Sequence, residues 1–220
     1  MPCAVSAVVA TTQPWPEVEP CLDSLHAQIA DADGEIVLGD GSALGVPADA
    51  QQRYPRLRIL HRPGASVFRL RAEGVDASRG AIVAVTEDHC VVAPDWCGRI
   101  LAAHRAHPDA AAIGGAVENG ATTTWIDWAS FFLVNGASMP PIANGSRRAI
   151  ALQANVSYKR TALPPRADAL GQMEWILNQD LRRGGGTLVN DDAIRVSHVQ
   201  SLGVAATCRI HYDDGRTIAA

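Results

Sequence analysis

Short runs of β-branched and apolar residues alternate with helical patterns along most of this chain. Buried strands are predicted at residues 4–10, 35–38, 58–60, 81–85 and 111–117, and helices at residues 19–29, 66–77, 96–107 and 169–183. This alternation is typical of parallel strands that are joined by helical crossovers. We therefore predict an α/β fold with a mostly parallel central sheet and flanking helices. Residues 135–148 are rich in Gly, Pro, Asn and Ser, which predicts a loop.

The composition favours one soluble domain. A chain of 220 residues, 47% hydrophobic and 19% charged, is long enough to bury a substantial core. Its net charge of -4 gives no field that would attract nucleic acid, so nucleic acid is not an expected partner. A phosphate-bearing ligand must therefore be held locally, by a metal ion, by backbone N–H groups or by a few arginines.

The cysteines indicate a reducing compartment. Cys3, Cys21, Cys90, Cys97 and Cys208 are odd in number, scattered and never in a CxxC pair, so neither a disulfide framework nor a zinc knuckle is expected. The chain shows no basic region ahead of its first apolar run and no apolar stretch of about 18 residues. We expect a cytoplasmic protein, and a membrane-resident acceptor at the inner face of the membrane stays open.

Polar residues follow three of the predicted strands at the point where each strand ends. These segments are Thr11-Thr12, Asp40-Gly41-Ser42 and Glu87-Asp88-His89. In open parallel sheets, ligands bind beyond the carboxyl ends of the strands, where loops and helix N-termini converge. We therefore expect the three segments to lie together at one edge of the sheet.

Two of these segments have a functional and a structural interpretation each. Asp40 is suited to accept hydrogen bonds from a base or ribose, and equally to cap a plain turn through Gly41 and Ser42. Glu87 and His89 share one face of an extended backbone, so they are placed to reach a divalent ion and a diphosphate. The alternative is a solvated strand end.

Other candidate groups favour structural roles. His104 and His107 lie three residues apart on a helix, which predicts a solvated face more than a metal pair. Cys90 and Cys97 are expected to be buried apolar residues. Residues 184–186 are all glycine and are expected to cap the helix before them. Four aromatic residues in the segment 122–132 fall roughly at helical spacing, and they are Trp125, Trp128, Phe131 and Phe132. They favour core packing, with a stacking platform for a sugar or lipid as the alternative.

The order of several motifs resembles a known family. The succession VSAVVATT, CLDSLHAQ, EIVLGDGS, RAEGVDASRGAIVAV, TEDHCVVAPDW and IGGAVEN is similar to the nucleotide-sugar-binding half of the family-2 glycosyltransferases. NVSYKR, EWILNQDLRRGGG and IRVSH resemble the acceptor half of that family. The resemblance covers nearly the whole chain and implies a GT-A-like, Rossmann-like single domain, with residues 1–117 binding the nucleotide-sugar and residues 118–220 binding the acceptor.

The resemblance implies a metal-assisted, inverting sugar transfer. Glu87 and His89 match the two ends of the DxD metal motif, and His198 matches a position that completes the metal or diphosphate shell. The implied cofactor is a divalent cation, Mn²⁺ or Mg²⁺. Glu174 matches the residue that deprotonates the acceptor hydroxyl, although from the sequence alone an ordinary solvated glutamate is the more common case.

The resemblance also implies a nucleotide-sugar site. Asp40 matches a residue that contacts the nucleobase, and Arg71 lies where the family keeps an arginine near the nucleotide. Thr11, Glu87 and Asp88 are assigned to the same site. The acceptor is a saccharide, a lipid or a small molecule, and peripheral association with a membrane is an expectation of the same kind.

The chain departs from the family pattern at three positions. Gly39 replaces the first aspartate of the usual DD pair, Ala72 replaces a common asparagine, and His89 replaces the last aspartate of DxD. An imidazole suits Mn²⁺ better than Mg²⁺, which prefers oxygen ligands. Binding of the diphosphate without a metal is an alternative. A second expectation is that the chain is a short form of the family, without the further helical or membrane-proximal segments of many relatives.

Two other function classes fit parts of the pattern. A catalytically silent relative that binds a nucleotide or a partner protein would explain the altered DD and DxD motifs. A sugar nucleotidyltransferase would also place carboxylates and a metal at a strand end. The chain lacks the glycine-rich, lysine-bearing loop after the first strand that such enzymes commonly have.

Overall fold

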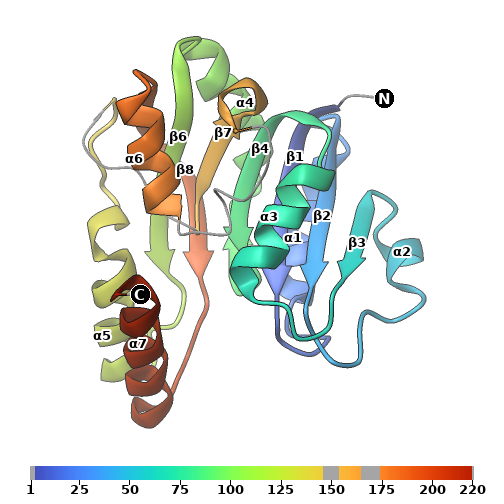
Figure 1. The fold of residues 1–220 in the computed structure, drawn as a ribbon, viewed down its shortest axis with the longest axis vertical. Coiled ribbons are helices and arrows are strands. Elements are labelled where there is room, and N and C mark those ends of the chain that lie inside the picture. Colours follow the sequence, from blue (N-terminus) through green and yellow to red (C-terminus); the bar gives the residue numbers. More distant parts are fainter. Residues whose placement is uncertain (1–2, 146–153, 165–173, 220) are drawn as a thin grey trace.

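The computed structural model of the protein describes residues 3–145, 154–164 and 174–219 (Figure 1). The strands are β1 (Cys3–Thr11), β2 (Gly34–Asp40), β3 (Leu57–His61), β4 (Gly80–Glu87), β5 (Cys90–Val92), β6 (Ala110–Asn119), β7 (Val156–Lys159) and β8 (Thr187–His198). The helices are α1 (Glu19–Ile29), α2 (Ala50–Arg53), α3 (Val67–Ala77), α4 (Trp96–Ala106), α5 (Trp125–Asn135), α6 (Glu174–Arg183) and α7 (Val204–Ala219), with the 3-10 turns η1 (Gly136–Ser138) and η2 (Arg160–Ala162).

The described strands form one eight-stranded sheet in the order β3-β2-β1-β4-β7-β6-β8-β5. Strand β1 pairs in parallel with β2 and β4, β2 with β3, and β6 with β8. Among the described strands, β7 and β5 run the other way. The prediction of a mostly parallel sheet with flanking helices is confirmed. The two reversed strands have four and three residues, too few to show a pattern in the sequence.

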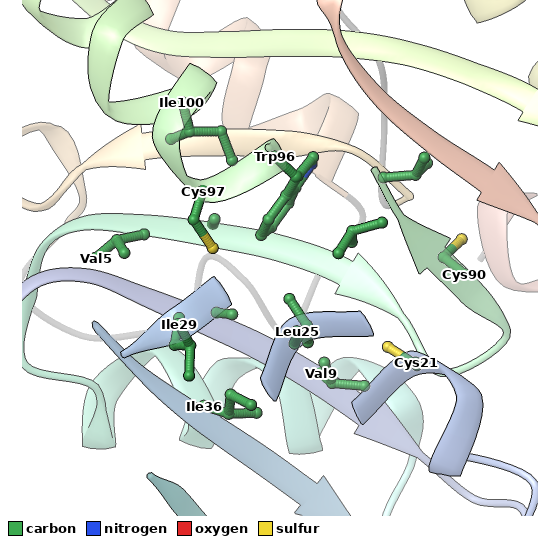
Figure 2. Packing of buried hydrophobic residues seen from close by; sticks show 14 of the residues in the cluster. Val5, Val9, Cys21, Leu25, Ile29, Ile36, Cys90, Trp96, Cys97 and Ile100 are labelled. Carbon is green, nitrogen blue, oxygen red and sulfur yellow. The ribbon is translucent and has the colours of Figure 1, made fainter. Parts of the chain in front are cut away.

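Helices cover both faces of the sheet, and the side chains of β1 alternate between them. Val5 and Val9 pack with residues of α1 and α4 on one face, where Trp96 is fully buried (Figure 2). Val8 points to the other face and packs with Val75 of α3. Burying each such side chain contributes about 1.5–3 kcal/mol. Because both faces are covered, these strands are continuous apolar runs, as parallel strands commonly are.

Close packing of α3 explains one departure from the family pattern. A Cβ atom on Gly39 would lie 2.8 Å from the carbonyl oxygen of Leu70 and 2.9 Å from its Cβ. An aspartate at position 39 is therefore excluded unless α3 shifts. Ser66 caps α3 by accepting a hydrogen bond from the backbone N–H of Arg69.

A buried asparagine holds the register between β6 and β8. The pairing shifts between Gly115 and Ala116, so that β8 carries extra residues at this point. The Nδ2 group of Asn155 donates to the carbonyl oxygens of Ala116 (2.8 Å) and Ile194 (3.0 Å), and its Oδ1 accepts from Nε1 of Trp96 (2.9 Å). This network fixes the last part of β8, which ends at His198.

The second half of the chain contains the largest differences from the sequence predictions. The predicted loop 135–148 begins inside α5 and η1, and its residues 146–148 lie outside the described residues. The predicted helix 169–183 is described from Glu174 onward. Helix α7 was not predicted. Gly186 caps α6 as expected, with its N–H 2.8 Å from the carbonyl oxygen of Leu181. Among the described helices, none has the length and apolar character needed to cross a bilayer.

Candidate active site

The short strand β5 brings the ends of β4 and β8 together. Glu87 is the last residue of β4, and Asp88 and His89 form the turn into β5. Strand β5 pairs with the end of β8, with Cys90 opposite His198. The backbone N–H of Val199 then donates to the carbonyl oxygen of His89 at 2.8 Å. Side chains separated by 109 residues in the sequence are therefore adjacent.

Glu87, His89 and His198 form a compact cluster of three potential ligands. The Nε2 atoms of His89 and His198 are 2.9 Å apart, and Oε2 of Glu87 lies 3.3 Å from the first and 3.5 Å from the second. All three ligand atoms lie within 4.8 Å of one another. The two imidazole rings meet edge to face, with centroids 4.4 Å apart.

These separations fit a divalent cation. Ligand atoms bonded at about 2.1 Å to one ion lie about 3–3.5 Å apart at octahedral or tetrahedral angles. Two imidazoles and one carboxylate form a donor set that first-row transition ions accept readily. The structure thus brings together the three residues that the sequence predicted for the metal site.

Opposite charges stabilise the cluster when no cation is bound. Burial alone would raise the pKa of Glu87, but hydrogen bonds with His198 and His89 outweigh burial and hold that pKa well below its usual range. Burial would likewise lower the pKa of His89, but hydrogen bonds to Asp88 and Glu87 raise it to about 10. A cation that binds Nε2 of His89 must therefore displace a proton.

Two members of the cluster, Glu87 and His89, line a cleft of about 690 Å³, whereas His198, which is 8% exposed, is not among the lining residues. Val67 and Arg71 of α3, the segment from Val199 to Leu202 after β8, and Ile210 of α7 form other parts of the wall. In Figure 1 the ends of β6 and β8 point toward α5 and α7 at the lower edge of the sheet. The complete lining is Ala10, Thr12, Gln13, Glu17, Pro20, Val67, Arg71, Glu87, Asp88, His89, Val91, Val199, Gln200, Ser201, Leu202 and Ile210.

Arg71 and Asp88 line this cleft, whereas Thr11 and Asp40 do not. Arg71 belongs to α3, and only 2% of its surface is exposed. The hydroxyl of Thr11 donates to Oδ2 of Asp88 at 2.6 Å, and Oδ1 of Asp88 lies 2.8 Å from Nδ1 of His89.

Asp40 is buried at the end of β2, next to the end of β1, and both of its carboxylate oxygens have partners within the chain. Oδ1 accepts from the backbone N–H of Ser42 at 2.9 Å, and Oδ2 lies 2.7 Å from Nδ1 of His61. The contact with Ser42 is that of the turn that the sequence offered as an alternative, and the contact with His61 joins β2 to β3. Because Asp40 is only 1% exposed, contact with a nucleobase would require this turn to open.

Glu174 is the first residue of α6, and its side chain lies outside the described residues, as does the preceding segment 165–173. Its position relative to the cleft is therefore a prediction from the family pattern alone.

Several lining residues were not predicted. Gln13 and Glu17 follow β1 in a proline-rich turn, and Gln200 and Ser201 follow His198 in a segment without periodicity. The sequence did contain one signal for this part of the site, the T-x-x-D capping box at the start of α5. In it, Asp127 accepts a hydrogen bond from Thr124. Asp127 also accepts from the Ser201 hydroxyl at 2.8 Å, which ties the segment after β8 to α5.

The other predicted groups have mixed outcomes. Cys90 and Cys97 are buried, as expected. The expected solvated face is wrong for His104, which is buried and whose Nε2 lies 3.0 Å from the hydroxyl of Ser157. Its pKa falls to about 4, mainly because of burial. His107 is exposed, as predicted.

Core packing is correct for one aromatic residue of α5 and wrong for two. Phe131 is buried, with its ring centroid 6.4 Å from that of His198. Trp125 and Phe132 are 71% and 55% exposed. Their helical spacing was correct, but the buried stripe of α5 is narrower than the aromatic pattern suggested.

Comparison with known proteins identifies the family. Residues 6–165 match the family described as glycosyl transferase family 2. The chain belongs to this family. It is also 30% identical over 102 residues to a protein named putative glycosyltransferase EpsH from Bacillus subtilis (strain 168), a match that covers 44% of this chain and 29% of that protein.

Solved structures show the same GT-A glycosyltransferase fold. The mannosyltransferase PcManGT from Pyrobaculum calidifontis, in complex with GDP-Man and Mn²⁺, matches with a TM-score of 0.66 and 16% identity over 96% of this chain and 61% of that one. TarS residues 1–349 from S. aureus match with a TM-score of 0.61 and 14% identity over 86% of this chain and 58% of that one. The chain thus spans less than two thirds of the length of each of these relatives.

Proposed function

We propose that this family 2 member transfers a sugar from a nucleotide-diphosphate donor to an acceptor hydroxyl, with inversion at the anomeric carbon and with the help of a divalent cation. The observation that supports this most strongly is the convergence of Glu87, His89 and His198, of which Glu87 and His89 line the cleft. Beyond the carboxyl ends of parallel strands, such a cluster is suited to a charged ligand.

The donor is best accommodated between the cluster and α3. Arg71 supplies a permanent positive charge on the cleft wall. The related mannosyltransferase was solved with GDP-Man, which supports a nucleotide-sugar as the ligand class. We propose Arg71 as a contact of the nucleotide, and Asp40 as a base contact if its turn opens.

Glu87, His89 and His198 would hold the cation. When bound there, it supplies positive charge that neutralises the diphosphate as the glycosidic bond breaks. Two imidazole ligands favour Mn²⁺ over Mg²⁺. The Mn²⁺ in the related mannosyltransferase agrees with this preference.

Glu174 is proposed as the general base. Its place in the family pattern is that of the carboxylate that accepts the proton of the acceptor hydroxyl, and direct attack by that hydroxyl gives inversion. The acceptor would approach from the side of α5 and α7, where Trp125 and Phe132 are exposed.

Each of the five cysteines is a free thiol, which fits a reducing cytoplasm.

The test is a thermal-shift screen with nucleoside diphosphates, with and without Mn²⁺ or Mg²⁺. At 100 times the dissociation constant, a bound ligand raises the unfolding midpoint by about 5–10 °C for a domain of this size. We expect one nucleoside diphosphate to raise the unfolding midpoint by this amount, and to raise it further when Mn²⁺ is present. No shift with any nucleotide would contradict the proposal.

Transfer activity then separates an enzyme from a silent relative. With the matching nucleotide-sugar, Glu174→Gln is expected to abolish transfer and to retain the nucleotide shift, because the amide cannot accept the proton. Nucleotide binding without any turnover in the wild-type protein would favour the silent relative. Unchanged turnover in the variant would remove Glu174 from the mechanism.

A further inference from the structure

Asp88 occupies the middle of the Glu87-Asp88-His89 turn, and its two carboxylate oxygens contact the protein itself. Oδ2 accepts from the Thr11 hydroxyl at 2.6 Å, and Oδ1 lies 2.8 Å from Nδ1 of His89. Only 14% of the Asp88 side chain is exposed. The carboxylate is therefore committed to two partners before any ligand enters the cleft.

The hydroxyl of Thr11 has a fixed direction. Its Oγ1 accepts from the backbone N–H of Gln13 at 3.0 Å, so its own proton is directed to Asp88. Thr11 is 2% exposed and ends β1, which makes it a rigid anchor within the sheet. The anchor holds Asp88, and Asp88 holds the imidazole of His89.

The contact with Asp88 decides which nitrogen of His89 faces the cluster. Because Nδ1 is directed to Asp88, Nε2 is presented to Glu87 and His198. A carboxylate on the second nitrogen of a metal-binding histidine fixes the orientation and tautomer of the ring and strengthens it as a ligand.

We propose that Asp88 and Thr11 are positioning residues for His89, and that they act on cation binding instead of contacting the sugar nucleotide. This inference rests on the proposed cation site. It replaces the nucleotide-binding role that the sequence suggested for both residues.

The test measures the affinity of the protein for Mn²⁺ alone, by electron paramagnetic resonance of the free ion. Asp88→Ala is expected to weaken Mn²⁺ binding about 10- to 100-fold, the usual effect of losing such an outer partner. Asp88→Asn keeps an acceptor for Nδ1–H and should lose less than Asp88→Ala. Thr11→Val removes one hydrogen bond to the carboxylate and should cost about three- to tenfold.

Two neighbouring residues give matched controls. Glu17 lines the same cleft, so Glu17→Gln removes one negative charge without touching His89. Thr12 also lines the cleft next to Thr11, and it makes no contact with Asp88 among the hydrogen bonds of the described residues. Glu17→Gln and Thr12→Val are expected to bind Mn²⁺ within about twofold of the wild-type protein, because neither side chain contacts Asp88 or His89 among the hydrogen bonds and ion pairs of the described residues.

The unfolding midpoint without metal separates positioning from folding. A positioning role predicts that Thr11→Val and Asp88→Asn lose Mn²⁺ affinity while each retains a cooperative unfolding transition. If Asp88→Ala binds Mn²⁺ as tightly as the wild-type protein does, the positioning role is overturned but the cation site is not. The same conclusion follows if Glu17→Gln loses as much Mn²⁺ affinity as Asp88→Ala does. Absence of Mn²⁺ binding by the wild-type protein would overturn the cation site and the positioning role together.

Discussion

Replacing Asn155 with alanine should destabilise the protein by about 3–5 kcal/mol, because the side chain joins β6, β8 and α4 through three buried hydrogen bonds. Asn155 is 1% exposed, and Trp96, which donates to it, is fully buried. Alanine leaves the indole N–H without its acceptor, at a cost of about 1–3 kcal/mol. The carbonyl groups of Ala116 and Ile194 also lose their donor, and the lost amide leaves a small void.

Equilibrium unfolding in urea, followed by far-UV circular dichroism, measures this loss. A 3–5 kcal/mol loss is a large share of the roughly 5–15 kcal/mol that stabilises a typical domain. Gln52→Ala on the exposed surface of α2 is the control, and its effect should stay within about 0.5 kcal/mol. In a double-mutant cycle with Trp96→Phe, the double variant should lose about 1–2 kcal/mol less than the sum of the two single losses. The reason is that phenylalanine has no N–H group to be left unsatisfied. A loss below about 1 kcal/mol for Asn155→Ala would refute the reasoning from buried hydrogen bonds.

Three further predictions concern stability. Burial holds the pKa of His104 at about 4, below the value of about 6.5 expected in the unfolded chain, so the free energy of unfolding should fall as the pH drops from 6.5 to 4. His104→Gln should flatten that slope in urea titrations, and an unchanged slope would contradict the buried neutral imidazole. For Glu35, burial is outweighed by the hydrogen bonds of Arg79, which lower its pKa, so its contribution should be lost as the pH falls below 4.5. Glu35→Gln should cost about 2 kcal/mol at pH 7 and nearly nothing in strong acid, and a pH-independent cost would be inconsistent with the ion pair. Gly39→Ala should lower the unfolding free energy by about 1–3 kcal/mol, because its Cβ would crowd Leu70, and an unchanged midpoint would show that α3 adjusts freely.

The first half of the fold was predictable because its strands are buried on both faces. Residues of β1, β2 and β4 form continuous apolar runs, and polar groups mark the end of each run. From that pattern, Glu87 and His89 were recognisable as candidates for the site. The later half depends on β5 and β7, which are too short for periodicity, so the pairing of Cys90 with His198 is visible only in three dimensions.

The direction of side chains was harder to predict than their position in the chain. Thr11 and Asp40 lie at strand ends as expected, but Thr11 is hydrogen-bonded to Asp88 and Asp40 to Ser42 and His61, and neither Thr11 nor Asp40 lines the cleft. The spacing of Trp125 and Phe132 predicted a helix but not which of its sides faces solvent. Gln200 and Ser201 line the cleft only because β8 ends beside the turn at His89, a placement that no local pattern encodes.

The central claim, that Glu87, His89 and His198 jointly bind a divalent cation, is tested most directly by anomalous X-ray scattering from crystals grown with Mn²⁺. We predict one strong anomalous peak within bonding distance, about 2.0–2.3 Å, of Oε2 of Glu87 and of Nε2 of both histidines. A well-ordered structure that shows no Mn²⁺ at this cluster, or Mn²⁺ bound only elsewhere, would contradict the claim.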